Sequence, residues 1–564
     1  MRLSVALAAC AATVVMTACG GGGDRAADGG GVAEQAPAGG YKTFAGGPPG
    51  GSLIVLSDRE PDDLNPLTFD SNPAYQLVHL MFRALARRDS TLSNYQPDFL
   101  ERWETPDPNT VVMHVRPGLK WHDGRPATAG DVVFTIETQK NKAVGSPRQA
   151  DVAAVSSVRA TDSMTVEVKL SRTGPSTLNS LLEVIPVPKH ILASVPADRI
   201  RISDFGKKPV GNGLYRFGSW QPGQQVTVDA NPDAPEGRPS LDRIVVRNVP
   251  DASARFTSLL SGEGDFLPRV PAEQKARVEA GRNVKLYHAP RVRPAWIAWN
   301  VDKAPVNDVR VRRAFLMAVN RPLLVQGLLG KDGEAALSVI PPALREHSPA
   351  VRPIPYDVAG AGRLLDEAGW RDANGDGIRE KNGQPLRIEV EYSSSDPVRQ
   401  DMLVAMQAEL RKAGIQLAPR AYESTAWVER LRAREFTGSF WGWGWGPGVM
   451  APNAEALFHS RSIPPGGPNF AGYRSPRADA LIDQLLSETD STRARGMWQQ
   501  LEQTLVDDAV YAPIYLDPEF VGVNSRFANV KFRGPEWWED VIYWHVPTNL
   551  RTPRDRMGSA PPKR

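Results

Sequence analysis

The chain has 564 residues, too many for one ordinary domain, so we expect two or three domains. Its 41% hydrophobic and 23% charged residues are typical of a soluble globular protein. The formal charge of +3 is nearly balanced, and no block of Lys and Arg resembles a nucleic-acid-binding arm, so we exclude nucleic acid as a partner.

The first predicted element is an export signal at residues 1–18. Arg2 supplies a positive charge, and residues 3–16 are mostly small and apolar, which is typical of a secretory signal peptide. The segment ends in MTAC, residues 16–19, which resembles the lipobox of bacterial lipoproteins, although Leu is usual at the first position. The resemblance implies cleavage before Cys19 and a lipid on its thiol. The alternative is an ordinary signal peptide followed by an unmodified cysteine.

The predicted mature chain contains one cysteine, because Cys10 lies within the signal. No disulfide is therefore expected, and a thioether anchor explains a single cysteine at the first mature position. Residues 19–51 are glycine-rich and predict a flexible tether with a reach of roughly 30 Å. Residues 553–564 predict a disordered polar tail. The sequence thus predicts an exported body, on the periplasmic or cell-envelope side, tethered to a membrane.

The predicted body begins with a short buried strand at residues 53–56, LIVL. Alternation of Val111, Met113 and Val115 predicts a half-exposed strand over residues 110–115. Further along, Asp308 is a candidate helix cap, and Val311, Phe315 and Ala318 follow on one helical face.

A strand–helix–strand unit is predicted near residue 400. Residues 386–392 alternate as a strand, and Asp396-Pro397 supplies an N-cap with an N1 proline. A helix then continues to residue 410, Gly414 stands where a C′ glycine belongs, and residues 415–417 open the next strand. This unit is a βαβ crossover, so the fold class is α/β with a parallel or mixed sheet.

Several separated segments resemble one family, the extracytoplasmic solute-binding proteins of family 5, which are the peptide-, oligopeptide- and nickel-type receptors of ABC transporters. The resemblance is strongest in KWHDG (residues 120–124) and AGDVVF (129–134), preceded by Trp103. It continues in order through residues 210–232, 251–266 and 296–321, and it covers nearly the whole body.

The resemblance implies a two-lobed periplasmic-binding-protein fold, similar to type II, with an extra domain inserted in the first lobe. Ligand would lie between the lobes, and hinge closure over it would be the signal that a permease reads. Carried onto this chain, the parts are lobe I (52–85, 206–292 and 516–552), inserted domain II (86–205) and lobe III (293–515).

The segment FWGWGWGPG, residues 440–448, alternates three tryptophans with glycines. In a strand the indoles of Trp441, Trp443 and Trp445 would share one face, and the other face would be bare backbone open to close approach. The resemblance places this segment in the cleft, so we expect one or two indoles to face ligand; the alternative is that all three are core. The candidate ligand-binding residues here are Trp441, Trp443, Trp445, Gly446, Gly448 and Asn453.

Peptide-binding relatives usually carry an aspartate in this segment that pairs with the peptide ammonium. Here the ammonium-binding position falls on Gly448 and the family's second acidic position on Ala451, and residues 438–454 contain no charged side chain. A buried ammonium needs an anion, so either Asp70 or Glu423 substitutes, or the ligand lacks that ammonium. The segment Asp70, Ser71, Asn72 and Tyr75 corresponds to the cleft side of lobe I in the family; the alternative for it is a simple Asx-turn before Pro73.

A calcium loop is a weaker possibility. Asp372, Asn374 and Asp376 occupy its first three ligand positions, but Gly383 stands where the bidentate Glu belongs, so we favour a metal-free turn. No histidine pair has metal-site spacing, and no nucleophile elbow, P-loop or nucleotide motif occurs. We therefore predict a protein that is not an enzyme and has no cofactor.

The sequence predicts a monomeric, lipid-anchored binding protein of an ABC importer. It would bind a small peptide or another medium-sized organic solute and deliver it to a permease and ATPase complex. Two alternatives stay open: a receptor for a non-peptide ligand such as an oligosaccharide or conjugate, and a sensor lipoprotein that uses the same cleft for signalling.

Overall fold

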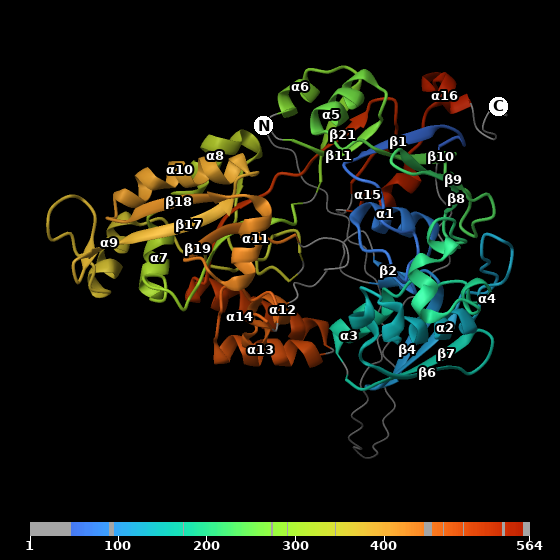
Figure 1. The fold of residues 1–564 in the computed structure, drawn as a ribbon, viewed down its shortest axis with the longest axis horizontal. Coiled ribbons are helices and arrows are strands. Elements are labelled where there is room, and N and C mark those ends of the chain that lie inside the picture. The colour runs from blue at the N-terminus through green and yellow to red at the C-terminus, as the bar shows by residue number, and fades with distance from the viewer. Residues whose placement is uncertain are drawn as a thin grey trace, which may run out of the picture. The chain divides into compact units, whose positions relative to one another are not determined.

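Most of the chain from residue 47 onward is described by the computed structural model shown in Figure 1. The described ranges are 47–88, 95–172, 174–271, 274–289, 291–344, 346–444, 454–465, 467–488, 490–532 and 536–556. The predicted signal peptide, Cys19, most of the tether, Trp445, Gly446, Gly448 and Asn453 lie outside these ranges. Within them, no helix combines the length and apolar character needed to cross a bilayer.

An apolar strand, β1 (Ser52–Ser57), lies inside a seven-stranded sheet of the described residues. Its residues 53–56 are all buried, and it pairs in parallel with both neighbours, β10 and β11. A continuous apolar run is what a parallel strand covered on both faces requires, so the predicted buried strand is confirmed. In order, the strands are β12 (Val284–His288), β21 (Phe520–Asn524), β11 (Phe266–Val270), β1, β10 (Arg243–Asn248), β9 (Gln225–Ala230) and β8 (Tyr215–Gln221).

Short helices accompany this sheet. α5 packs on β1, β11 and β21, and Phe256 and Leu259 of α5 join Leu56 in a buried cluster. α1 contacts α15 and β8. The helices are α1 (Asn72–Met81), α5 (Ala252–Ser261), α6 (Lys275–Glu279), α15 (Trp537–Asp540) and α16 (Pro553–Arg556).

A four-stranded antiparallel sheet is inserted in the chain between β1 and β8. Its strands, in order, are β4 (Leu100–Asp107), β5 (Thr110–Val115), β7 (Thr165–Leu170) and β6 (Val155–Ala160). In β5 the side chains of Val111, Met113 and Val115 are buried, and those between them are partly exposed, so the predicted alternation is confirmed. Nearby in the chain are β2 (Ala86–Arg88), β3 (Tyr95–Pro97), α2 (Ala129–Lys140), α3 (Pro175–Leu182) and α4 (Lys189–Leu192).

The segment 120–134, which carries much of the family resemblance, has a structural role. Asp131 is buried at the start of α2, where its carboxylate accepts the backbone N–H of Thr128 at 2.8 Å and of Lys189 at 2.9 Å. The indole of Trp121 lies 3.4 Å from the same carboxylate. The buried carboxylate therefore holds three separate parts of the chain together.

The second block of the resemblance, which begins at residue 210, packs against the first. The backbone N–H of His122 donates to the carbonyl of Gly211 at 2.7 Å. A Cβ on Gly211 would lie 2.0 Å from the carbonyl oxygen of Met81, so only glycine allows this approach of two backbones.

Six strands of the described residues form a third sheet. In order they are β14 (Glu334–Ala335), β20 (Tyr511–Leu516), β13 (Pro294–Trp299), β19 (Gly438–Gly442), β17 (Arg387–Ser393) and β18 (Gln416–Tyr422). The helices of this part are α7 (Val309–Met317), α8 (Arg321–Leu329), α9 (Val358–Glu367), α10 (Pro397–Arg411), α11 (Ser424–Ala433), α12 (Ala454–Phe458), α13 (Pro476–Ser487) and α14 (Ser491–Asp508). A separate two-stranded pair consists of β15 (Glu380–Lys381) and β16 (Gln384–Pro385).

The predicted βαβ unit is confirmed as β17, α10 and β18. The two strands pair in parallel, and the carboxylate of Asp396 caps α10 by accepting the N–H of Arg399. Gly414 has a φ of 82°, the left-handed conformation expected after a helix. The helix predicted after Asp308 is confirmed as α7, whose face with Val311 and Phe315 is buried.

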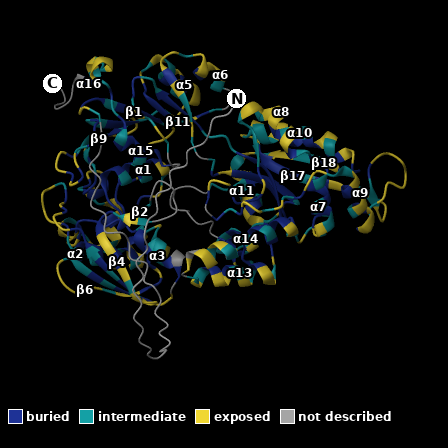
Figure 2. Ribbon diagram, turned by 180° about the vertical axis from the view of Figure 1, so that it is seen from behind, coloured by how far each residue is buried: buried dark blue, intermediate teal, exposed yellow. Residues whose placement is uncertain are grey.

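Both faces of this third sheet are covered. On β13, Ile297 and Trp299 pack into one core with Phe440, and Trp296 and Ala298 pack into another with Trp441. Figure 2 shows the buried strand β17, in dark blue, beside α8 and α10, which also carry exposed residues. The second core contains apolar residues of α12, α13 and α14, which lie together in Figure 1.

The ends of the body differ from the sequence prediction. Residues 553–556, which we expected to belong to a disordered tail, form α16, and Asp555 is buried against Arg526 and the N–H of Ser52. The predicted tether also ends earlier than residue 51, because the N–H of Gly50 donates to the carbonyl of Ser240. The hydrogen bond from Ser52 to Asp555 joins residues 503 positions apart, so the local composition of either end did not predict it.

Candidate functional site

The candidate site lies beside the strand that begins the tryptophan–glycine segment. β17, β18 and β19 run in parallel, so their carboxyl ends meet at one edge of the sheet. In α/β sheets, ligands bind at this edge. β19 ends at Gly442, so Trp441 is within the strand and Trp443 lies just beyond it.

The glycines of this segment are not simply open backbone. Gly442 is paired with Ala295 of β13, and a Cβ at Gly442 would lie 2.6 Å from the carbonyl oxygen of Pro294. A Cβ at Gly444 would lie 3.2 Å from Cζ of Arg293. At these two positions the protein itself occupies the space that we expected a ligand or another chain to approach.

The two described indoles of the segment have different environments. Trp441 is only 4% exposed and packs edge-on against Trp296, Trp443 and Phe470, with ring centroids 5.3, 6.1 and 5.8 Å away. Trp443 is partly exposed at the margin of the same core. Trp441 is thus mainly a core residue, and Trp443 is better placed to contact a ligand.

A cavity of about 1480 Å³, open to solvent, lies against these rings. This volume exceeds the ~300–1,000 Å³ typical of small-molecule sites, so an extended or bulky ligand has room. The indole of Trp427, on α11, also lines the cavity and is held by a hydrogen bond from its Nε1 to Ser439 Oγ at 3.1 Å. The lining residues are Asn300, Asp302, Lys303, Arg399, Trp427, Val428, Leu431, Arg432, Ala433, Arg434, Trp441, Gly442, Trp443, Pro464, Pro465, Gly467, Pro468 and Phe470.

The one carboxylate among these lining residues, Asp302, is already paired. It accepts from Arg434 at 2.7 Å and from Arg474 at 2.8 Å. Partial burial alone would raise the pKa of Asp302, but the hydrogen bonds from Arg434 and Arg474 lower this pKa below its ordinary value. Asp302 is thus a fixed anion that orients Arg434, and it has little capacity left for a cationic ligand.

Glu423, one proposed substitute for the missing carboxylate, caps α11. Its Oε2 accepts the backbone N–H of Thr425 at 2.8 Å and of Ala426 at 3.3 Å. It is exposed and is not among the lining residues of the cavity. Its position before a helix explains the residue without a ligand.

The segment from Asp70 to Tyr75 belongs to the part of the chain around the seven-stranded sheet. Ser71, rather than an Asx-turn, caps α1 by accepting the N–H of Ala74. The carboxylate of Asp62 accepts the backbone N–H of both Asp70 and Ser71, at 2.9 and 3.0 Å. The carboxylate of Asp70 itself is exposed.

The other two candidate residues of this segment also have internal partners. Asn72 accepts a hydrogen bond from Gln76 one turn later. The ring of Tyr75 stacks on His79 with centroids 4.0 Å apart and meets Trp538 edge-on at 5.5 Å. Burial raises the pKa of the Tyr75 hydroxyl well above its ordinary value, so it stays protonated and can donate.

The candidate calcium loop is a hydrogen-bonded turn. The carboxylate of Asp372 accepts the N–H of Gly375 and Gly377, and Asn374 accepts the N–H of Asp376. One oxygen each of Asp372, Asp376 and Glu380 lies within 4.8 Å of the others. Sequence reasoning missed Glu380, because we looked for the last ligand three residues further along. The backbone bonds explain the turn without an ion.

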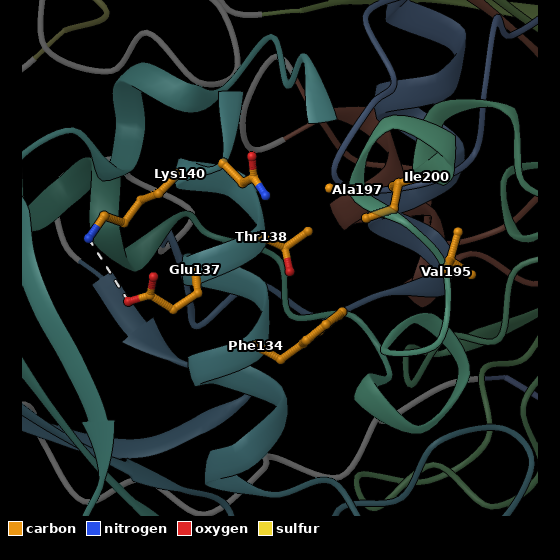
Figure 3. Close-up of a pocket in the computed structure, with 8 residues that line it drawn as sticks. Phe134, Glu137, Thr138, Lys140, Val195, Ala197 and Ile200 are labelled. Atoms are coloured by element: carbon orange, nitrogen blue, oxygen red, sulfur yellow. Dashed lines mark ion pairs between the residues drawn. The ribbon is translucent and has the colours of Figure 1, made fainter. Parts of the chain in front are cut away.

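A second cavity, of about 520 Å³, lies between α2 and the 3₁₀ helix η3 (Ala197–Ile202). Figure 3 shows Phe134 and Thr138 facing Val195 and Ile200 across it. Its charged lining residues, Glu137 and Lys140, form an ion pair with each other at 3.9 Å. This cavity contains none of the residues predicted from the sequence and offers no unpaired charge, so we do not assign it as the ligand site.

The fold and the site define the class of an α/β solute receptor. A family model described as "Bacterial extracellular solute-binding proteins, family 5 Middle" matches residues 94–464. This chain belongs to that family, and its fold is the two-lobed α/β fold of these receptors.

Particular relatives are similar over nearly the whole chain. The oligopeptide-binding protein AppA of Bacillus subtilis (strain 168) is 29% identical over 512 residues, which are 88% of this chain and 93% of that protein. The structure of AppA from Bacillus subtilis in complex with a nonapeptide matches with a TM-score of 0.71 at 28% identity, covering 89% of this chain and 100% of that one. "Probable deoxycholate-binding periplasmic protein YgiS" of Escherichia coli (strain K12) is 28% identical over 517 residues, covering 86% of this chain and 91% of that protein.

Proposed function

We propose that this protein is the membrane-tethered binding protein of an ABC importer. It captures peptide-like or other medium-sized organic solutes and delivers them to a permease. The observation that carries the proposal is the open cavity of about 1480 Å³, walled by Trp427, Trp443 and Phe470, at the carboxyl edge of the sheet. Family membership and the similarity to an oligopeptide-binding protein support it.

The physical role of such a site is to bind and release a solute unchanged. Aromatic walls bury apolar surface and contribute about 0.5–1.5 kcal/mol per ring pair beyond the area effect. Hinge closure then makes further contacts only when ligand is present, which distinguishes the loaded from the empty receptor.

A non-peptide ligand is the second candidate. Gly448 stands at the family's ammonium-binding position and carries no charge, and the lining carboxylate, Asp302, is paired with two arginines. A similar protein, YgiS of Escherichia coli, is named as a probable deoxycholate-binding protein, and deoxycholate is not a peptide. This similarity supports a non-peptide ligand.

Native mass spectrometry tests the proposed function. A soluble form that begins at Gly20 and so lacks Cys19, exported behind a cleavable signal peptide and purified from the periplasm, is expected to retain an organic solute that is lost on denaturation. Peptide masses would support the first candidate and other organic masses the second. If the protein retained no solute and bound none of the solutes added to it, a receptor function would be contradicted.

The membrane tether is tested separately. Labelled fatty acid is expected to enter the full-length protein through Cys19, and Cys19→Ser is expected to abolish both labelling and membrane association. Labelling of the Cys19→Ser variant would contradict the lipid anchor.

A further inference from the structure

The charges that line the large cavity are unbalanced. Among the described lining residues, the cations are Lys303, Arg399, Arg432 and Arg434, whereas the one carboxylate is Asp302. Residues 445–453, which adjoin the site in sequence, contain no charged side chain and cannot add a carboxylate. The cavity wall therefore has an excess of positive charge, which repels a ligand ammonium and attracts an anion.

Arg399 stands out among these cations. Its side chain is only 14% exposed, and its Nε is buried with no hydrogen-bond acceptor among the described residues. Its nearest anion is Asp396, with an Nε to Oδ2 distance of 3.3 Å, but the other oxygen of Asp396 accepts the backbone N–H of Arg399 at the start of α10. The guanidinium also lies over the ring of Phe440, with Cζ 5.8 Å from the ring centroid, so Asp396 is its one charged partner among the described residues. A largely buried cation with one imperfectly placed anion is favourable for binding a second anion.

The other cations differ from Arg399. The guanidinium of Arg434 is held by Asp302, by Asn300 and by the carbonyl of Phe470. Arg432 is exposed on α11. Lys303 is partly buried and adds to the positive field at the cavity wall.

We propose that ligands of this site are apolar carboxylates, bound through the anionic group at Arg399 with their apolar part on Trp427 and Trp443, and that a free ammonium is not required. The proposal rests on the proposed function and names its ligand class. A guanidinium binds carboxylate through paired N–H donors, and the indole faces accept apolar groups or rings. N-blocked peptides and non-peptide organic acids share this chemistry.

Five probes separate the alternatives: one apolar pentapeptide in four forms, and deoxycholate, an apolar carboxylate without peptide bonds. The peptide is prepared with its N-terminus free or acetylated and its C-terminus free or amidated. Dissociation constants are measured by isothermal titration calorimetry with the soluble form that begins at Gly20. We expect amidation to weaken binding about tenfold or more, and acetylation to leave it within about twofold, because a charge-assisted pair is lost only in the first case.

The variant Arg399→Gln tests the residue, and Arg399→Lys keeps the charge without the paired donors. In Arg399→Gln the dissociation constants of the free and the amidated peptide are expected to differ by less than about twofold. In Arg399→Lys this ratio is expected to lie between those of the parent and of Arg399→Gln. Arg411→Gln, an exposed arginine on the same helix α10, is the matched control and is expected to bind as the parent does. Thermal melts of each variant confirm folding.

The outcomes distinguish this inference from the proposed function. Binding that depends on a free N-terminus and tolerates amidation would overturn the inference and leave the receptor function standing, as would a neutral or cationic retained solute. Binding of deoxycholate alone, dependent on Arg399, would support the inference and assign the ligand to the non-peptide class. Failure of all five probes, with no retained solute, would overturn both.

Discussion

At the residue scale, Trp441 and Trp443 show that neighbours in one repeat can have separate roles. Both rings line the cavity, but Trp441 is only 4% exposed within a core that includes Trp296, whereas Trp443 is partly exposed at the margin of that core. The three-indole face expected from strand periodicity is interrupted, because β19 ends at Gly442. Core and ligand roles of the two rings can therefore be separated by substitution.

We expect Trp443→Ala to raise the dissociation constant of a retained solute about tenfold, since an aromatic contact contributes about 0.5–1.5 kcal/mol beyond area burial. Its free energy of unfolding should change little. Trp441→Ala should instead lower the free energy of unfolding by about 3–5 kcal/mol, as for other buried aromatic truncations.

Trp370→Ala is the matched control for both variants. Trp370 is partly exposed and contacts Lys381, away from the lining residues of the cavity. It should leave ligand affinity unchanged in titration calorimetry. Equal loss of affinity in Trp370→Ala and Trp443→Ala would contradict the role assigned to Trp443.

At the element scale, Asp131 tests why the family motif has an acid at the start of α2. Asp131→Ala removes the acceptor of two backbone N–H groups and of the Trp121 indole, all from a buried position. We expect the free energy of unfolding to fall by about 2–4 kcal/mol, because each buried donor left unpaired costs about 1–3 kcal/mol and partial relaxation recovers some of it. Urea unfolding followed by circular dichroism measures this.

Asp251→Ala provides the comparison, because Asp251 also caps a helix, α5, but accepts from Ala254 at an exposed site. A loss of about 1 kcal/mol is expected there. If the free energy of unfolding fell equally in both variants, the buried contacts of Asp131 would contribute no stability beyond that of a helix cap.

Elements whose signals are local were predictable from the sequence. The capping residues Asp308 and Asp396 predicted α7 and α10, and the alternation of apolar residues predicted β5. These signals could be used because caps and periodicity act over a few residues. The cavity was predicted only in part. The sequence analysis missed Trp427 and Arg399, which line the cavity from the first turns of α11 and α10. No local sequence pattern predicts that the first turns of two helices lie at the same edge of a sheet.

Glu423 was chosen as a ligand residue for its charge, and the structure shows it as a helix cap. The sequence contains the relevant signal, an acidic residue directly before Ser424 and a helical segment. Charge alone therefore gave less information than charge together with position.

At the scale of the whole molecule, one buried ion-pair cluster joins both ends of the body. Arg526 on the segment after β21 pairs with Asp265 at 3.0 Å and with Asp555 at 2.5 Å, and Asp555 also accepts the N–H of Ser52 at 2.9 Å. Burial alone would raise the pKa of Asp555, but Arg526 and the backbone donors lower it well below its ordinary value.

We expect Asp555→Asn to lower the free energy of unfolding by about 1.5–3 kcal/mol at neutral pH, since Arg526 then keeps Asp265 but loses one of its two buried carboxylate partners, and a hydrogen bond to a charged group contributes about that much. This contribution should be fully present above about pH 4 and be lost as the pH falls toward the folded-state pKa. Chemical unfolding across pH measures it. Asp233→Asn, in an exposed ion pair with Arg216, should cost less than about 1 kcal/mol, and an equal cost would contradict the assignment.

Two histidines should make the whole molecule sensitive to mild acid. Burial lowers the pKa of His79 and of His122 to about 4, although each ring has a backbone carbonyl within hydrogen-bonding distance, that of Tyr75 at 2.8 Å and that of Gly213 at 3.1 Å. Both rings are thus neutral in the folded protein, whereas in the unfolded chain they take up protons near pH 6.5.

The unfolded state therefore binds more protons between about pH 6.5 and 4, and linkage requires stability to decrease as the pH falls through this window. The double variant His79→Gln/His122→Gln, which keeps a side-chain donor at both positions, should lose less stability than the parent between pH 7 and 5, as measured by urea unfolding. Between pH 7.5 and 8.5, where both rings are neutral in either state, the two proteins should show the same slope. A parent and a double variant with identical slopes below pH 6.5 would mean that these rings are protonated without cost in the folded state, and the acid sensitivity would then have to come from the carboxylates.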